Sequence, residues 1–290
     1  MNQNQSEMTK YFFRASAADF KKIPGCPIAY WVATKLGEIY HNSALFEEMA
    51  HSMQGMITGD NNKFLRRWFE TSFVKLSLNR SNISEVNTNV CYWIPYNKGG
   101  DLRKWFGNNE FVLNWKNEGR DLTRSRTQNA DYYFKPCITW TFISSSFFAA
   151  RKCENGFVWD VAGSSAFPKN NNSTAPLLSF MCSKVGKKIL DGMNPTLNYQ
   201  VENILALPVH KRLKAYEEKL AVKTNILVST AKSDWNAYER SWDFTFLPLI
   251  QVICDQWSVV NQDKSIQVLV TNHLPLDTTI SEAYTTLRAH

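Results

Sequence analysis

The apolar period changes partway along the middle of the chain, and this change constrains the fold more than any other feature. Residues 138–143, Ile-Thr-Trp-Thr-Phe-Ile, alternate as a strand with one buried face does. Two more strand-like runs, 147–152 and 157–161, flank Asn155-Gly156, and Asn-Gly is a strong hairpin signal. From Leu177 to Leu190 the apolar residues recur at helical spacing instead, which predicts one amphipathic helix. The pattern indicates a mixed α+β fold, with an antiparallel or mixed sheet and packed helices.

Helical segments are expected on both sides of these strands. From Ser16 to Glu48 the pattern predicts helix, and Leu213, Tyr216 and Leu220 again follow helical spacing. Between them, residues 194–209 predict a loop and a short strand that ends at Pro208. We therefore expect three parts: a helical connector over 1–55, a central domain over 56–210, and a helical spacer with a C-terminal α/β extension over 211–290.

Residues 97 to 135 are the most basic and loop-rich part of the chain. A turn at Lys98-Gly99-Gly100 is followed by Leu102, Trp105 and Phe106 at i, i+3, i+4 spacing, which predicts one amphipathic helical turn that buries the rings. Arg103 and Lys104 would then project outward. Because glycine tolerates a close approach of the backbone to a ligand, the turn predicts a phosphate contact.

The charge and the aromatic content point to an anionic partner. The 290 residues carry a formal net charge of +7, which favours a polyanion, although solubility alone explains such a charge equally well. Aromatic residues stand beside cations in Arg66-Arg67-Trp68-Phe69 and Arg103-Lys104-Trp105-Phe106, as on nucleic-acid surfaces. The same strings also fit amphipathic helices with buried rings, the more frequent explanation for any single one. No apolar run approaches eighteen residues, so we expect a soluble, cytoplasmic protein with no membrane partner.

The motifs of catalysis and metal binding are missing from this sequence. The six cysteines have no zinc-site spacing and predict reduced, mostly buried thiols. A methyltransferase needs a glycine-rich turn for S-adenosylmethionine and an Asn-Pro-Pro-aromatic loop, and Asn194-Pro195-Thr196-Leu197 lacks the second proline and the aromatic residue. Glu217-Glu218-Lys219 matches a nuclease Glu-x-Lys by letters alone, within a helical pattern. Ser144-Ser145-Ser146 lacks a nucleophile elbow, and hydroxyls at strand ends cap turns or bind phosphates.

Six ordered blocks between residues 10 and 245 carry a family resemblance. They are KYFFRASAADFKKIPGCPIAYWV (10–32), MITGDNNKFLRRWFE (56–70), PYNKGGDLRKWFGNNEFVLNW (95–115), YYFKPCITWTFISSSFF (132–148), FVWDVAGSSAFPKN (157–170) and NPTLNYQVENILALPV (194–209). Together they resemble the PglX family, the adenine-specific DNA methyltransferases of BREX phage-defence systems, which are related to type IIG restriction enzymes.

In that family a catalytic domain, with the S-adenosylmethionine site and an Asn-Pro-Pro-Tyr loop, precedes a target recognition domain. This chain resembles only the part after the catalytic domain. The resemblance implies a TaqI-like target recognition domain over 56–210 that binds a specific sequence of double-stranded DNA. It implies no cofactor in this chain, because S-adenosylmethionine would bind the missing catalytic domain, and it implies that domain or other BREX components as partners.

The resemblance and the basic region together predict eleven DNA-contacting residues. They are Asn61, Lys63, Arg66, Lys98, Arg103, Lys104, Arg124, Arg126, Lys135, Ser144 and Ser145. Two alternatives stay open. The chain completes a methyltransferase with a separate catalytic subunit, or it is a protein-interaction module that binds a partner subunit or a DNA-mimic inhibitor, since a DNA mimic offers the same negative charges as DNA.

Overall fold

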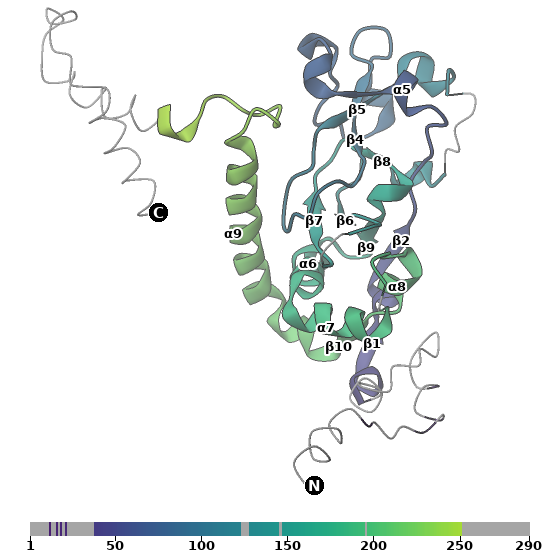
Figure 1. Ribbon diagram of the computed structural model, residues 1–290, viewed down its shortest axis with the longest axis vertical. Helices are drawn as coiled ribbons and strands as arrows, with labels where there is room; N and C mark the ends of the chain where they lie inside the picture. The colour runs from purple at the N-terminus through teal and green to yellow at the C-terminus, as the bar shows by residue number, and fades with distance from the viewer. Residues whose placement is uncertain are drawn as a thin grey trace, which may run out of the picture. The chain divides into compact units, whose positions relative to one another are not determined.

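The strands form three sheets in the computed structural model, which describes residues 38–122, 128–144, 147–194 and 196–250 together with Phe12, Ser16, Ala18 and Lys21 (Figure 1). The first sheet is antiparallel and has the order β2 (Ala50–Met53), β9 (Ser165–Pro168), β6 (Cys137–Trp140), β7 (Ala150–Cys153). The second has the order β3 (Leu65–Arg67), β5 (Phe111–Asn114), β4 (Trp93–Asn97), β8 (Val158–Trp159), with β4 and β8 parallel. The third pairs β1 (Ser43–Leu45) with β10 (Pro208–His210). The expected mixed α+β class is confirmed.

Helices pack against the first sheet. The α-helices are α4 (Phe46–Met49), α5 (Asn61–Phe64), α6 (Thr174–Cys182), α7 (Lys184–Met193), α8 (Val201–Leu205) and α9 (Glu217–Asn236). The 3-10 turns are η2 (Trp68–Glu70), η3 (Phe73–Lys75), η4 (Ile83–Glu85), η5 (Lys116–Gly119), η6 (Ala130–Tyr132), η7 (Val161–Gly163), η8 (Asn171–Ser173) and η9 (Lys211–Tyr216). Helix α6 packs on β6 and β7, and α8 packs against β2. A division between Lys232 and Ser233 separates two compact units, and all sheets lie in the first.

A buried polar link joins the two four-stranded sheets. At the end of β4, Asn97 Nδ2 donates to Thr139 Oγ1 of β6 at 2.7 Å, and this hydroxyl donates in turn to the carbonyl of Ser164 at 3.1 Å. The chain passes close by at Gly163, where a Cβ atom would lie 2.6 Å from the Asn97 carbonyl oxygen. Only glycine fits there. The sheets are therefore fixed to each other at the carboxyl end of β4, where the candidate site begins.

The turn at Asn155-Gly156 exists, but the hairpin predicted from it is wrong. Strand β7 before the turn pairs with β6, and β8 after the turn pairs with β4 in the other sheet. The turn is held by Phe134, whose carbonyl oxygen accepts from Gly156 N at 3.1 Å and whose amide donates to the Phe157 carbonyl at 2.9 Å. The turn carries the chain from one sheet to the other, because a distant segment supplies the hydrogen bonds that a hairpin partner would have supplied.

The single helix predicted over 177–190 is two helices, α6 and α7. The break is at Ser183, whose backbone is extended and whose Oγ accepts from Gly186 N at 2.9 Å. A serine N-cap starts a new helix more favourably than it continues an old one. At Gly186 a Cβ atom would lie 2.3 Å from the Phe180 carbonyl oxygen, so the two helices meet too closely for any other residue.

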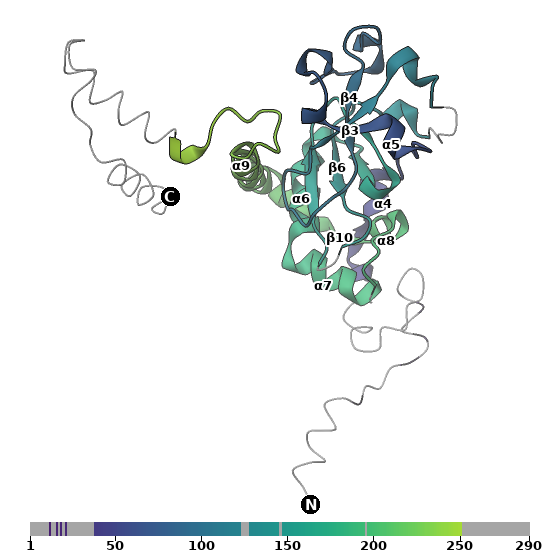
Figure 2. The same ribbon diagram turned by 45° about the horizontal axis from the view of Figure 1, so that its top comes forward.

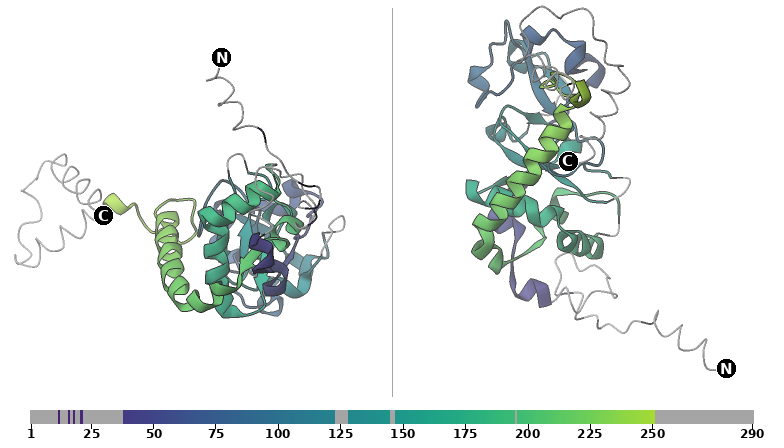
Figure 3. Two further views of the ribbon diagram at one scale, coloured as in Figure 1. Left: turned by 90° about the horizontal axis from the view of Figure 1, so that it is seen from below. Right: turned by 90° about the vertical axis from the view of Figure 1, so that its left-hand side faces the viewer.

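The flanking predictions hold in part. Within 16–48 the described residues 38–41 and the start of α4 are helical, as predicted, but the strand β1 lies between them. Strand β2 follows α4, so the expected helical connector also adds strands to two sheets. Residues 194–209 contain helix α8, and β10 begins at Pro208 instead of ending there. The helical prediction around Leu213, Tyr216 and Leu220 is confirmed by η9 and the 20-residue helix α9, which Figure 3 shows along its length. The part of the expected C-terminal α/β extension that follows residue 250 lies outside the described residues.

Candidate nucleic-acid interface

Three of the predicted DNA-contacting residues, Asn61, Lys63 and Arg66, lie on α5 and β3. Asp60 starts α5, because its Oδ1 accepts from Lys63 N at 3.0 Å. The Lys63 side chain is exposed and its ammonium lies 5.0 Å from the centre of the Phe64 ring. Arg66 is half-buried and Nη1 donates to the Asn62 and Leu65 carbonyls, each at 2.6 Å. Asn61 and Lys63 therefore face solvent, whereas the guanidinium group of Arg66 stabilises the turn at its own position by hydrogen bonds to the backbone.

Lys98 lies with Asn61 at a small cavity of about 220 Å³ beneath α5. Its Nζ donates to Oδ2 of Asp160 at 2.6 Å, and the Tyr96 hydroxyl donates to the same oxygen at 2.8 Å. Burial, followed by the charge of Asp160, raises the pKa of Tyr96 well above its ordinary value, so the phenol stays a donor. The other oxygen of Asp160 accepts from Ala162 N at 2.8 Å. The ammonium of Lys98 is thus neutralised by a carboxylate inside the protein.

The predicted helical turn at Leu102–Phe106 is wrong, because residues 98–110 form an irregular loop against the edge of β7. Trp105 N donates to the Ala150 carbonyl at 2.9 Å and its carbonyl accepts from Lys152 N at 2.8 Å, with Trp105 at a φ of 74°. Phe106 is buried, but Leu102 is 40% exposed. The strand edge offers backbone hydrogen bonds that a single isolated helical turn lacks.

The cations of this loop turn toward the protein, contrary to the expected outward projection. Lys104 Nζ donates to the Cys182 carbonyl at 2.9 Å and lies 5.3 Å from the centre of the Phe147 ring. Arg103 is half-buried and lies close enough to lower the pKa of Arg151. The structure therefore brings Lys104 to α6 and Arg103 near β7, whereas Asn61 and Lys98 line the small cavity described above.

The remaining predicted residues are separate from both groups. Lys135 is exposed, with its ammonium 4.9 Å from the centre of the Tyr132 ring. Ser144 is buried and its hydroxyl donates to the Phe147 carbonyl at 2.9 Å. Arg124, Arg126 and Ser145 lie outside the described residues. As a set, the predicted residues do not share one contact network in the described part of the chain.

Cations and aromatic rings combine in a second group, of which the sequence indicated only Arg67 and Phe69; its members are exposed apart from the half-buried Tyr92. The group, named here the Tyr92 surface, consists of Lys75 and Lys116 around Tyr92, and of Arg67, Phe69 and Phe73, which contact one another or Trp68 and precede Lys75 in the chain. The ammonium groups of Lys75 and Lys116 each lie 5.9 Å from the centre of the Tyr92 ring. Phe69 and Phe73 are 51% and 57% exposed. Arg67 to Lys75 run from the end of β3 through η2 and η3, Tyr92 precedes β4, and Lys116 begins η5, so three separate segments build the surface.

Residues Arg66-Arg67-Trp68-Phe69 fold differently from the amphipathic helix that their sequence also fits. They are not part of such a helix: β3 ends at Arg67 and η2 begins at Trp68. Arg67 lies 5.9 Å from the centre of the Phe69 ring, and Phe73 lies edge-on to Trp68 at 6.4 Å. Within the described residues, Arg67, Lys75 and Lys116 form no ion pair. Exposed cations without carboxylate partners remain available for an anion.

Metal clusters and membrane-spanning helices are both missing from the described ranges. There, no three side chains of His, Cys, Asp or Glu gather closely enough to hold a metal ion. Cys137, Cys153 and Cys182 are buried free thiols and Cys91 is half-buried, as expected for the cysteines that the structure describes. The helices in those ranges include none with the length and apolar content needed to cross a bilayer.

The relatives of the chain are adenine-specific methyltransferases, although comparison with protein-family models gives no match. The chain is 34% identical over 269 residues, 88% of its length, to adenine-specific methyltransferase PglX of Lacticaseibacillus casei (strain Zhang). It is 36% identical over 274 residues, 91% of its length, to adenine-specific methyltransferase BrxX of Escherichia coli O9:H4 (strain HS). In both cases it spans 22% of the relative's length. The resemblance to PglX is confirmed.

Proposed function

We propose that this chain is the DNA target-recognising part of an N6-adenine-specific methyltransferase in a BREX-type phage-defence system. The observation that carries the proposal is the homology to adenine-specific methyltransferases over about nine-tenths of the chain. Methyl transfer would belong to a catalytic domain that binds S-adenosylmethionine outside this chain. Double-stranded DNA in the cytoplasm would be the ligand, and the catalytic domain or another component of the same system the protein partner.

The Tyr92 surface supports this proposal by its chemistry. Its cations match DNA phosphates, which fix the position of a protein on a duplex, and its exposed rings can contact sugars and base edges. Asn61 and Lys63 extend the exposed polar surface at the same sheet, since α5 precedes β3 directly. Lys135 is a further exposed cation. Their arrangement fits phosphate contacts from several loops rather than a single recognition helix.

The first prediction is that the chain binds duplex DNA with a strong salt dependence. Because each phosphate contact releases condensed counterions, the logarithm of the affinity should fall linearly with the logarithm of salt concentration between about 50 and 200 mM. A mobility-shift titration of the 290-residue chain with its cognate duplex measures this, and a scrambled duplex serves as the control. An absence of binding at low salt, or binding that salt does not weaken, would contradict the proposal.

A second candidate function is docking of a separate methyltransferase catalytic domain, and helix α9 favours it. Val222 and Ile226 of α9 are 62% and 60% exposed and lie one helical turn apart, and Tyr216 at the end of η9 is 57% exposed. Exposed apolar side chains in a row on a helix are typical of a protein interface.

We expect Val222→Asp combined with Ile226→Asp to abolish capture of a catalytic domain in a nuclease-treated pull-down, while duplex binding is unchanged. Lys223→Asp and Ser229→Asp, exposed on the same helix, are the matched control. Capture that both pairs of variants leave intact would exclude this face as the docking site.

A further inference from the structure

The small cavity beneath α5, of about 220 Å³, has an ion pair in a wall that is open to solvent. Lys98 and Asp160 form that pair, and Thr58 and Asn61 line the cavity beside them. Ile57, which is 47% exposed, and the exposed Asn61 lie at its mouth. The Lys98 side chain is itself 28% exposed, so a ligand that enters the cavity can reach it.

The carboxylate in this wall is already occupied by donors from the protein. Oδ2 of Asp160 accepts from Lys98 Nζ at 2.6 Å and from the Tyr96 hydroxyl at 2.8 Å. Its other oxygen, Oδ1, accepts from Ala162 N at 2.8 Å. The Asp160 side chain is only 10% exposed. The carboxylate therefore fixes the ammonium and cancels its charge, but it offers little to a ligand.

The groups that remain for a ligand are hydrogen-bond donors. An ammonium has three N–H groups, and Asp160 takes one of those of Lys98. The side-chain oxygen of Asn61 accepts from the Thr58 hydroxyl at 2.5 Å, so the two N–H groups of Nδ2 point away from that bond. Among the described residues, these remaining donors of Lys98 and Asn61 have no partner. Two separate segments thus present donors without net charge to one small space.

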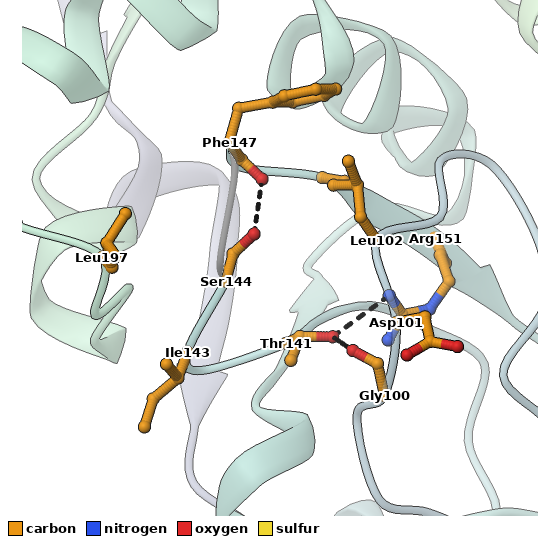
Figure 4. A pocket seen from close by; sticks show the side chains of 10 residues that line it. Gly100, Asp101, Leu102, Thr141, Ile143, Ser144, Phe147, Arg151 and Leu197 are labelled. Atoms are coloured by element: carbon orange, nitrogen blue, oxygen red, sulfur yellow. Dashed lines mark hydrogen bonds between the residues drawn. The ribbon is translucent and has the colours of Figure 1, made fainter.

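The larger cavity, of about 450 Å³, lacks this arrangement. Figure 4 shows Thr141 between Arg151 and Gly100: its hydroxyl accepts from Arg151 Nη1 at 3.4 Å and donates to the Gly100 carbonyl at 3.0 Å. Nε and Nη2 of Arg151 are buried and closed to a ligand. Asp101 adds a carboxylate to the same wall. The smaller cavity therefore has the more specific recognition chemistry.

The donors of the small cavity select an uncharged acceptor. A phosphate is held by cations that keep their charge, whereas the charge of Lys98 is cancelled by Asp160. Two edges of DNA base pairs place a pair of acceptors side by side. Guanine does so in the major groove with O6 and N7, and an A·T pair does so in the minor groove with adenine N3 and thymine O2.

We propose that Lys98 and Asn61 together read one base pair of the DNA target through such a pair of acceptors. This base contact rests on the proposed function and adds to it the residues that select the sequence. Lys98 and Tyr92 adjoin opposite ends of β4, about 20 Å apart because a strand rises roughly 3.3 Å per residue, a distance that about six base pairs span. The Tyr92 surface then supplies phosphate contacts, and the cavity supplies sequence preference.

The test is selection of bound duplexes from a randomised pool by the 290-residue chain, followed by sequencing. We expect the wild type to prefer one base pair by about tenfold at the position that the cavity reads. Lys98→Met and Asn61→Ala should each lose that preference and keep those at other positions. Asn61 is exposed, so Asn61→Ala keeps the test valid if Lys98→Met does not fold. Lys63→Gln removes an exposed cation of α5 from outside the cavity and, as the matched control, should keep every base preference.

Base analogues in the selected duplex distinguish the two edges. If guanine is read, 7-deazaguanine at that position weakens wild-type binding, and the effect disappears in Lys98→Met or Asn61→Ala, whichever side chain supplied the donor. If an A·T pair is read, 3-deazaadenine has this effect and 7-deazaguanine has none.

Equal base preferences in the wild type, Lys98→Met and Asn61→Ala would overturn the base contact but leave the proposed function standing, because the chain would still bind duplex DNA. A uniform loss of affinity for every sequence in both variants would also overturn it, since the cluster would then have a structural role only, as would the absence of an effect of either analogue. A chain that binds no duplex at low salt would overturn both the base contact and the proposed function.

Discussion

Replacing Arg67, Lys75 and Lys116 together by glutamine is expected to weaken duplex DNA binding about a hundred-fold at 0.1 M salt. All three cations lie on the Tyr92 surface and none is neutralised by an ion pair among the described residues. Each phosphate contact that is lost removes about 0.9 from the slope of log affinity against log salt, so the slope should fall by nearly three units. Mobility-shift titrations over a series of salt concentrations measure both quantities.

The matched control removes three cations from elsewhere in the same unit. Lys184 and Lys188 on α7 and Lys214 on η9 are exposed, and α7 lies at the end of this unit opposite β4 and β5 (Figure 1 and Figure 2). Their replacement by glutamine changes the net charge by the same amount and should leave the slope nearly unchanged. If both triple variants weaken binding equally, the DNA is held by overall charge and not by the Tyr92 surface.

The second large effect is expected from Asp160→Ala, which should lower the free energy of unfolding by about 3 kcal/mol. This carboxylate accepts from Lys98, from the buried Tyr96 hydroxyl and from Ala162 N. Removing it leaves these three donors without their acceptor. The Lys98 side chain is 28% exposed, so water recovers part of its loss and the estimate is at the lower end for a buried pair. Urea unfolding followed by circular dichroism gives the value.

The control for this prediction is the exposed ion pair Lys187–Asp191 on α7, with side chains 44% and 48% exposed. Asp191→Ala should cost less than about 1 kcal/mol, because water solvates both partners once they separate. Similar losses for the two variants would show that Asp160 acts as an ordinary surface carboxylate and that the cluster does not hold β4 to β8.

Local sequence patterns predicted those helices and strands whose conformation follows from the spacing of their apolar residues. The alternation around Ile138 predicted the strand β6, although β6 is buried on both faces and not on one, and the helical spacing around Leu213 predicted η9 and α9. At Asn155-Gly156 the local rule found the turn but not the pairing. The partners of β7 and β8 are chosen by segments far away in sequence, which no turn signal encodes.

In the candidate site, too, the sequence indicated the residue types but not the partners that they contact after folding. The sequence indicated cations beside aromatic rings, but it could not separate Lys98, which Asp160 neutralises, from Lys75, which remains exposed. The distances from Lys75 and Lys116 to the Tyr92 ring are set only when three separate segments of the chain fold together. Arg151 was missed altogether, and one signal was available: within Ala-Arg-Lys-Cys it alternates with Cys153, on the face that period two assigns to the interior. A charged residue at an inward strand position can be recognised from the sequence as a buried charge.

The contact between Trp105 and β7 protects the outer strand of the first sheet from pairing with another chain. β7 is the last strand of its sheet, and an uncovered outer strand is a template on which another chain can add. The loop 98–110 pairs the Ala150 carbonyl and the Lys152 amide of that strand with the amide and carbonyl of Trp105. A variant with this loop shortened would expose these backbone groups of β7. We expect such a variant to aggregate through β7 of neighbouring molecules, rather than to lose a binding contact.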